Sequence, residues 1–214
     1  MDTEYIQIKT AASALFAILA VECLAVWVSQ TRLNNLIIIG IARCLEAGLL
    51  LCSVYLFETN GSKAIGLPGA PIQPAILRGV LWSLGFGLVV VVAALVLYLA
   101  GINPLRLISA QLPQSMLALA AFFLVGGVIS PVAEEMFFRG VLFGYLRRWG
   151  AWLAVGGSTL LFVLAHAPGR GVPLPQLVGG LLFALTYEKE KNLLVPITIH
   201  ILGNLAIFTI SILN

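Results

Sequence analysis

The chain has 214 residues, of which 60% are hydrophobic and only 10% are charged, whereas ordinary soluble domains carry roughly 25% charged residues. With a mean hydropathy of +1.04, this composition excludes a soluble globular protein and predicts that lipid surrounds most of the surface. The net charge of +3 is too small and too scattered to indicate a nucleic-acid partner. The three cysteines have neither a metal-binding nor a disulfide spacing.

Apolar segments follow one another along the chain. They cover residues 10–29, 34–57, 79–100, 115–146, 151–166, 176–187 and 193–213. A bilayer core about 30 Å thick requires about 20 apolar helical residues. The pattern therefore predicts an all-α, polytopic membrane helix bundle with about seven spans, of which 151–166 and 176–187 are short. The first residues lack the basic start of a cleavable signal peptide, so the first span is expected to be retained.

The whole chain, 1–214, is expected to form a single integral membrane domain. Residues 1–100 are predicted to form three leading transmembrane helices with a proline-containing loop at 58–78. Residues 115–213 are predicted to form a four-helix core. Within this core the connection 167–175 is expected to lie at membrane depth, where irregular backbone is tolerated only beside protein or a water-filled cavity.

The distribution of basic residues predicts the orientation in the membrane. If all segments cross, one side receives Lys9, Lys63, Arg78, Arg147, Arg148, Lys189 and Lys191, and the other receives Arg32, Arg106 and Arg170. The richer side is expected to be cytoplasmic. This predicts a multi-pass protein of the cell membrane with its N-terminus inside and its C-terminus outside.

The fourth segment carries ionisable residues, which cost about 2.5–3.5 kcal/mol each within a membrane. Glu135 and Arg139 stand four residues apart and can pair along one helix face. Glu134 points about 100° away and has no evident partner in its own helix. Pro131 is expected to free the carbonyl of Gly127 and to kink the helix just before the acids. This difference between the two glutamates predicts that one carboxylate is held ionised by Arg139 and that the other is free for proton chemistry. Alternatively, a Glu-Glu-Arg network could simply hold helices together.

The two histidines of the chain complete this polar set. His166 ends the fifth segment, immediately before a Pro-Gly turn. His200 lies in the last segment, with Asn204 one turn later on the same face. Pro196 is expected to open that helix as well. A lone histidine in a helix is usually a satisfied core residue, but with a glutamate these side chains supply the base, proton partner and hydrogen-bond donors that a water-activating site needs.

The ionisable residues of the leading spans have a simpler interpretation. Glu22 stands alone in the first span, and Arg43 and Glu46 form a spaced pair in the second. Their positions favour helix packing or snorkelling over chemistry.

Three motifs in this order resemble the CPBP family, also called the ABI family, of CAAX proteases and bacteriocin-processing enzymes. The family pattern is Glu-Glu-x-x-x-Arg on one helix, Phe-x-x-x-His on the next, and His-x-x-x-Asn or Asp later. The chain has Glu134-Glu135-x-x-x-Arg139, Phe162-x-x-x-His166 and His200-x-x-x-Asn204. The resemblance covers roughly 115–213, and the best-known branch of the family is the type II CAAX prenyl endopeptidase.

The resemblance implies how water would be activated. Glu134, with His166, would hold and deprotonate the attacking water. His200 and Asn204 would donate hydrogen bonds to the developing oxyanion.

The resemblance also implies that Glu135 and Arg139 position the cluster and fix its charge state. On this reading the protein is a glutamate-type peptidase that needs no cofactor. An older interpretation of the family as metalloproteases leaves zinc, bound by Glu134, His166 and His200, as an alternative.

These features predict an intramembrane endopeptidase that cleaves a membrane-anchored protein or peptide substrate, in C-terminal processing of the CAAX or sorting-signal type. The substrate and the oligomeric state stay open. One alternative is a non-catalytic membrane scaffold or an immunity-type protein that binds a peptide without cutting it. A proton-coupled transporter would also use buried Glu, His and Arg, but the chain lacks the paired halves that many such transporters show.

Overall fold

The computed structural model describes residues 5–31, 34–67, 71–166 and 173–213. Within these ranges the regular structure is helical, without β-strands. This confirms the predicted all-α membrane bundle. The predicted loop at 167–175 lies largely outside the described residues.

Five helical runs of the described chain are long and apolar enough to cross a membrane. They are α1 (Ile8–Ser29), α2 (Asn35–Phe57), α3 (Gln73–Leu99), the continuous run Met116–Trp149, and α9 (Leu194–Ile212). Two further helices, α7 (Ala151–Ala165) and α8 (Leu174–Glu190), are shorter. The predicted set of long and short spans is therefore confirmed.

Some helix boundaries differ from the prediction, most of all in α3 and α8. Helix α3 begins at Gln73, not at residue 79, because Pro74 falls in its first turn, where the missing N–H of proline costs no hydrogen bond. Helix α8 extends beyond the predicted 176–187 at both ends. The predicted loop 58–78 is correspondingly shorter, and it contains a turn of 3₁₀-helix, Gly61–Ile65.

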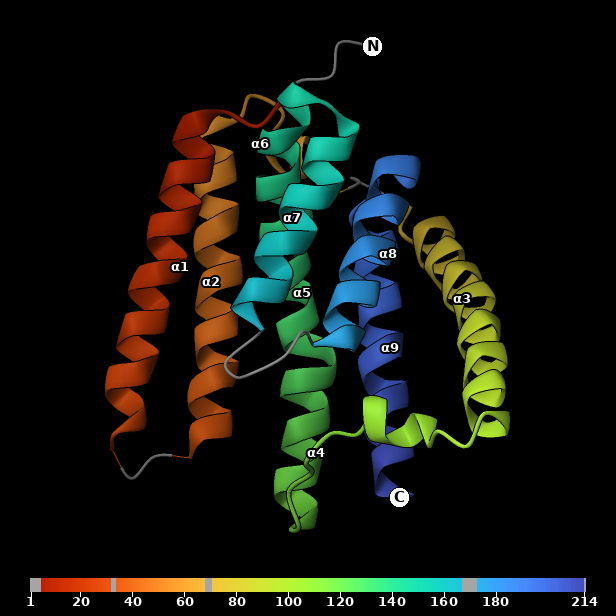
Figure 1. The fold of residues 1–214 in the computed structure, drawn as a ribbon. Coiled ribbons are helices and arrows are strands. Elements are labelled where there is room, and N and C mark those ends of the chain that lie inside the picture. The colour runs from red at the N-terminus through yellow and green to blue at the C-terminus, as the bar shows by residue number, and fades with distance from the viewer. Residues whose placement is uncertain (1–4, 32–33, 68–70, 167–172, 214) are drawn as a thin grey trace.

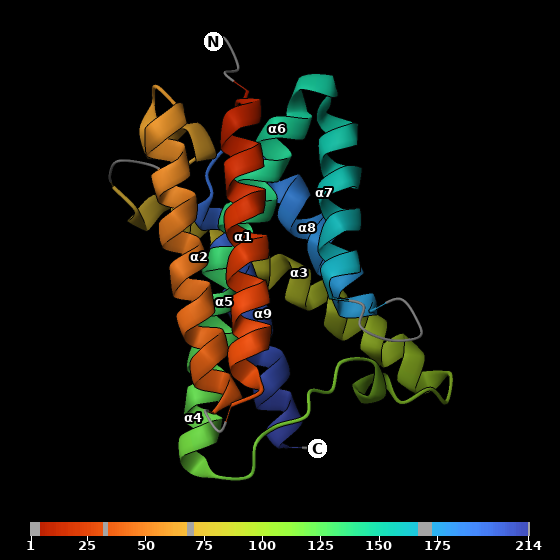
Figure 2. The same cartoon turned by 90° about the vertical axis from the view of Figure 1, so that its left-hand side faces the viewer.

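The helices surround one central column, the run Met116–Trp149, which contains α4 (Met116–Leu124), α5 (Ser130–Glu135) and α6 (Gly144–Leu146). Figure 1 shows the α1–α2 hairpin on one side of this column and α3 on the other, with α7 and α8 in front. Helix α9 runs beside the column and also contacts α3. Figure 2 shows that α3 slants across the direction of the other helices.

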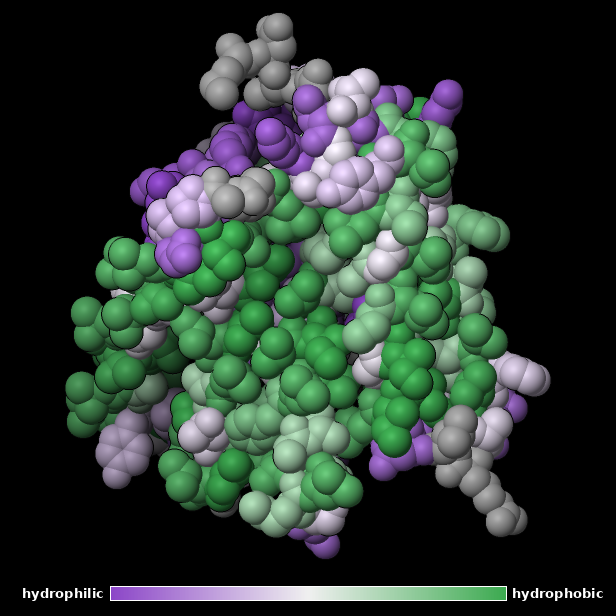
Figure 3. Space-filling model, turned by 180° about the vertical axis from the view of Figure 1, so that it is seen from behind, coloured by the Kyte–Doolittle hydropathy of each residue, from purple (hydrophilic) through white to green (hydrophobic). Residues whose placement is uncertain are grey.

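Polar side chains gather mainly at the end of the bundle where the N-terminus lies (Figure 3). Ion pairs join the elements there: Arg147 contacts Glu188 at 2.9 Å, and Arg78 contacts Glu190 at 3.1 Å. A hydrogen bond from Trp82, together with the Arg78 guanidinium, holds the pKa of the Glu190 carboxyl below its ordinary value. These contacts tie the start of α3 and the end of α6 to the end of α8.

Two groups of buried apolar residues position the polar centre. The larger lies toward the polar end and includes Leu50, Val54 and Phe143. The smaller consists mainly of aromatic and aliphatic side chains from the column, α7, α8 and α9, and includes Phe138, Phe162 and Phe183. All three rings lie against the guanidinium of Arg139 in the column.

Candidate active site

The innermost part of the site is the ion pair between Glu135 and Arg139, both of which are 0% exposed. Arg139 Nη1 donates to Glu135 Oε1 at 3.2 Å, and Nη2 donates to the carbonyl of Gly180 at 3.1 Å. The guanidinium also lies 4.7 Å from the ring centroid of Phe162 and 5.2 Å from that of Phe183. The predicted pairing along one helix face is confirmed, and the pair is enclosed by aromatic rings.

His200 joins this pair from α9. Its Nδ1 lies 2.8 Å from Glu135 Oε1, and its ring stacks on Phe183 with a centroid distance of 4.5 Å. A carboxylate paired with arginine can only accept a hydrogen bond, so His200 Nδ1 carries the hydrogen and donates it. The other ring nitrogen, Nε2, then lies 3.8 Å from Glu134 Oε2.

His166 approaches the same oxygen from the end of α7. Its Nδ1 is 2.8 Å from the carbonyl oxygen of Phe162. A carbonyl only accepts, so this nitrogen also donates, and His166 Nε2 is the atom that faces Glu134 Oε2 at 3.5 Å. The Nε2 atoms of two histidines from different helices therefore converge on one carboxylate oxygen.

The adjacent glutamates thus have different surroundings. Glu135 is held by Arg139 and His200, whereas Glu134 faces two histidine nitrogens supplied by other elements. When both histidines are neutral, their Nε2 atoms and the Glu134 carboxylate are all acceptors. Such a set can hold a water molecule by its hydrogens and take up a proton from it.

The side chain of Asn204 contacts the central column at a point where the backbone hydrogen bonding of the column is irregular. Residues Val125–Ile129 form a π-helical turn, in which Ser130 N–H bonds to the carbonyl of Val125. The next donor in that register would be residue 131, but Pro131 has no N–H. The carbonyl of Gly126 is therefore left without a helical donor, and Asn204 Nδ2 donates to it at 2.9 Å. The sequence prediction named the carbonyl of Gly127, whereas the carbonyl that accepts from Asn204 is that of Gly126.

The prediction that Pro196 opens the last helix is wrong. Helix α9 begins at Leu194, so Pro196 lies in its first turn, and the helix continues to Ile212. Proline is tolerated there because the first N–H groups of a helix have no intrahelical acceptor. His200 is consequently carried by a regular helix, which fixes its direction.

Sequence reasoning did not predict the ion pair between Arg43 and Glu22. The Arg43 guanidinium bonds to Glu22 on α1 and to Glu46 on α2. One feature of the sequence indicated that Glu22 has a partner on another helix: it is an acid within an apolar span that contains no basic residue. Which residue of a neighbouring helix would face it could not be read from the sequence.

The described residues do not support a preformed metal site. Across these ranges, no three His, Cys, Asp or Glu side chains are grouped as a metal ion requires. The Nδ1 atoms of both histidines bond to the carbonyl of Phe162 and to Glu135, so the two Nε2 atoms and Glu134 Oε2 are the groups that would hold the metal in the zinc alternative.

Comparisons with known proteins concern mainly the second half of the chain. Residues 114–206 match the family model of the Rce1-like type II CAAX prenyl endopeptidases. The membrane-embedded CAAX protease MroQ of Staphylococcus aureus (strain USA300) is 35% identical over 100 residues, which are 44% of this chain and 40% of that protein. An uncharacterised 24.3 kDa protein of Escherichia coli is 30% identical over 95 residues, 42% of either chain. The matched regions thus span about two fifths of these two relatives.

A longer match is found with the putative membrane peptidase YdiL of Bacillus subtilis (strain 168). It is 26% identical over 176 residues, which are 78% of this chain and 67% of YdiL. No solved structure matches the chain. The region 114–206, which contains Glu134 and the side chains that converge on it from α7 and α9, is therefore similar to the CAAX proteases.

Proposed function

We propose that this protein is an intramembrane endopeptidase in which Glu134 activates water for attack on a peptide bond. The observation that carries the proposal is the convergence of His166 Nε2 and His200 Nε2 on Glu134 Oε2, at 3.5 and 3.8 Å. The Glu134 carboxylate can therefore exchange protons with two histidines, whereas the neighbouring Glu135 carboxylate is ion-paired with Arg139. The match of residues 114–206 to the family model of type II CAAX prenyl endopeptidases supports the same class of reaction.

In the first step, Glu134 and His166 hold a water molecule and accept one of its protons as its oxygen attacks the carbonyl carbon of the substrate. General-base catalysis of this kind contributes about 10²–10⁴-fold. The tetrahedral intermediate then collapses, the C–N bond breaks, and the proton passes to the leaving amine. The products are a new carboxyl end and a new amino end.

The developing negative charge on the carbonyl oxygen requires donors. His200 can donate through Nε2 when its ring is protonated, because Nδ1–H is already directed at Glu135. The Glu135 carboxylate stabilises that charged ring, and Arg139 holds the carboxylate in place. Asn204 has a second amide hydrogen beyond the one donated to Gly126. Glu135 and Arg139 therefore position the cluster in this scheme.

The substrate is proposed to be a protein or peptide anchored in the membrane, because the site lies within a bundle whose flanks are apolar. The name of MroQ, a membrane-embedded CAAX protease, supports C-terminal processing. Residues 115–213 are proposed to supply the catalytic core, and the leading helices to complete one membrane domain. The polar end with the N-terminus is proposed to face the cytoplasm in the cell membrane.

The test is cleavage of membrane-anchored reporter peptides by the purified chain in proteoliposomes. Glu134→Gln keeps the size of the side chain but removes the base, so cleavage is expected to fall by about 10²–10⁴-fold. Glu188→Gln is the matched control, because Glu188 is also partly buried and ion-paired but lies at the polar end. Full activity in Glu134→Gln, or equal losses in both variants, would show the proposal to be wrong.

Metal independence is tested in the same assay. We expect cleavage to persist after dialysis against a zinc chelator, because the proposed base is a carboxylate and not a metal-bound water. Loss of activity on chelation, with recovery on addition of zinc, would instead support the zinc alternative at Glu134, His166 and His200.

A further inference from the structure

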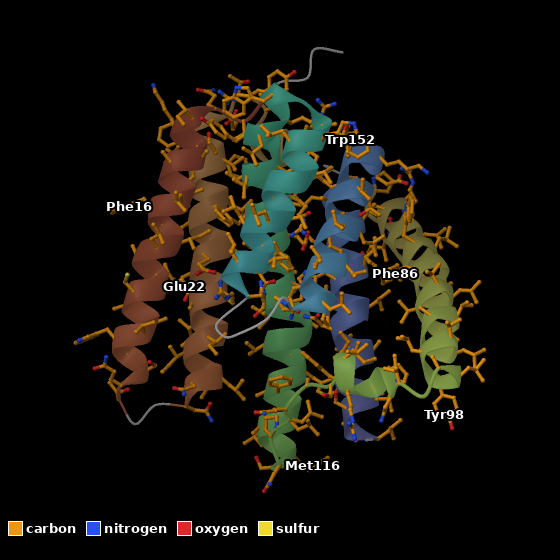
Figure 4. All side chains as sticks on the ribbon, in the orientation of Figure 1. Phe16, Glu22, Phe86, Tyr98, Met116 and Trp152 are labelled. Atoms are coloured by element: carbon orange, nitrogen blue, oxygen red, sulfur yellow. The ribbon has the colours of Figure 1, made fainter. Side chains whose placement is uncertain are left out.

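Helix α8 carries none of the residues of the three sequence motifs, yet it forms one wall of the candidate active site. It packs against both α7 and α9. Figure 4 shows side-chain nitrogen atoms (blue) between these helices near the level where α7 ends. Two residues of α8 contact the site: Gly180 accepts a hydrogen bond from Arg139, and the ring of Phe183 lies against His200.

Phe183 is buried, with 7% of its surface exposed, and its ring is stacked on the imidazole of His200. The two ring centroids are 4.5 Å apart and the angle between the planes is 21°. The other ring pairs found among the described residues are tilted or meet edge to face, as Phe143 and Tyr187 do at 87°. Phe183 therefore presents a flat face to His200, which is the arrangement that restricts tilting of the imidazole most.

The backbone of α8 explains why the Phe183 ring takes this position. In a helix an aromatic side chain points back toward the N-terminus, over the residue four positions earlier. That residue is Gly179, where a Cβ would lie 3.3 Å from Cε2 and from Cζ of the Phe183 ring. The absence of a side chain at residue 179 thus leaves the space that the ring occupies.

Three contacts hold the ring of His200. Its Nδ1 donates to Glu135 at 2.8 Å, Phe183 covers one face, and Phe162 of α7 meets it edge to face at a centroid distance of 5.8 Å. A single hydrogen bond leaves the ring free to tilt about that bond, and the ring torsion of histidine has broad minima of its own. The two aromatic contacts are therefore what fixes the plane of the imidazole.

The plane of this ring decides where Nε2 lies. Because the imidazole is rigid, a tilt about the hydrogen bond to Glu135 displaces Nε2 and leaves Nδ1 nearly in place. In the observed plane, His200 Nε2 lies 3.8 Å from Glu134 Oε2. A displacement of about 1 Å in a reacting geometry can cost about 100-fold in rate. A ring that is free to tilt would therefore be a poorer catalytic group even with its bond to Glu135 intact.

We propose that Phe183 is a positioning residue that holds the His200 imidazole in the plane in which Nδ1 donates to Glu135 and Nε2 faces Glu134. This inference rests on the proposed function. It makes α8 part of the catalytic machinery through an apolar side chain that acts on His200 and not on the substrate. The property that matters is the flat shape of the ring, because any apolar side chain would exclude water from the same space.

The first experiment measures kcat and KM of the full chain in proteoliposomes. Phe183→Leu keeps an apolar side chain but removes the flat face, so kcat should fall about 10–100-fold with little change in KM. Phe183→Tyr keeps the ring and should retain most of kcat. Phe143→Leu is the matched control, because Phe143 is also a buried aromatic residue but belongs to the main apolar core. It should lower the thermal stability and leave kcat and KM unchanged.

The second experiment observes His200 directly, by NMR of histidine-labelled protein in nanodiscs. The chain has two histidines, so His166→Gln leaves the signals of His200 alone and assigns them. Ring hydrogens that lie over the face of an aromatic ring are shielded by it. The His200 signals should therefore move downfield in Phe183→Leu, stay close to their wild-type positions in Phe183→Tyr, and be unchanged in Phe143→Leu.

A wild-type kcat in folded Phe183→Leu would overturn the inference. An equal loss of kcat in Phe143→Leu would also overturn it, as would a loss in Phe183→Leu without any movement of the His200 signals. If Phe183→Leu does not fold, Phe183→Met takes its place, because the flexible side chain of methionine fills irregular space without a flat face.

Failure of the proposed function gives a different result. The wild-type chain would then show no cleavage that depends on Glu134, whatever residue stands at position 183. The His200 signals would still show whether Phe183 holds the ring. Cleavage that depends on Glu134 but is the same with phenylalanine or leucine at position 183 would reject the role of Phe183 alone.

Discussion

At the residue scale, Glu135 and Arg139 illustrate how a local pattern becomes part of a larger network. Their spacing predicts the pair, because residues four apart meet on one helix face. The spacing does not predict that His200 Nδ1 donates to the same carboxylate or that Gly180 accepts from the guanidinium. Those partners belong to α9 and α8, so they depend on how the helices pack.

The pair is fully buried, so removing one member leaves the charge of the other without a counter-ion. We expect Arg139→Met to destabilise the protein by about 3–5 kcal/mol. Thermal unfolding in detergent micelles measures the effect. The double variant Glu135→Leu, Arg139→Met should lose less than the sum of the single variants, because it leaves no unpaired charge. Strict additivity of the two losses would contradict this account.

At the element scale, Asn204 of α9 supplies a hydrogen bond to the π-helical turn of the central column. Replacing it with Leu leaves the carbonyl of Gly126 without a donor, at a cost of about 1–3 kcal/mol. In a Pro131→Ala background, residue 131 has an N–H that can reach this carbonyl, so Asn204→Leu should cost less there. Unfolding experiments on the four proteins of this double-mutant cycle provide the test. Equal costs in both backgrounds would show that Pro131 is not responsible for the free carbonyl.

The contact of α3 with α9 depends on a close approach at Gly79. A Cβ at this position would lie 2.5 Å from Thr198 Cβ, so Gly79→Ala has to push the two helices apart. We expect a loss of about 1–3 kcal/mol in unfolding experiments, as for other overpacked sites. Gly85→Ala on the same helix is the control, because nothing lies within 4 Å of a Cβ there. A loss as large in Gly85→Ala would point to a general effect of alanine on α3.

At the scale of the whole molecule, the two ends of the bundle differ in charge. The chain termini lie at opposite ends (Figure 1), and the polar end carries the ion pairs of Arg78 and Arg147. Because basic residues are retained in the cytoplasm, a reporter that is active only outside the cytoplasm should be active when fused after residue 213. It should be inactive when fused after Gly61, in the connection at the polar end.

A fusion after Gln30, at the end of α1, serves as the internal control for this experiment, because it lies at the end of the bundle opposite the N-terminus. It should behave like the fusion after residue 213. The reverse pattern would place the N-terminus outside. A disagreement between the two fusions expected on the same side would contradict the number of crossings.

Composition and local spacing were sufficient for the membrane bundle, its long and short spans, and the division between Glu134 and Glu135, because hydropathy and helical periodicity act within single segments. Tertiary structure alone decided which atoms meet. It directed both histidine Nε2 atoms to one oxygen of Glu134, placed Asn204 against the carbonyl of Gly126, and paired Arg43 of α2 with Glu22 of α1. These outcomes depend on the packing of one helix against another and on a π turn, neither of which leaves a periodic pattern in the sequence.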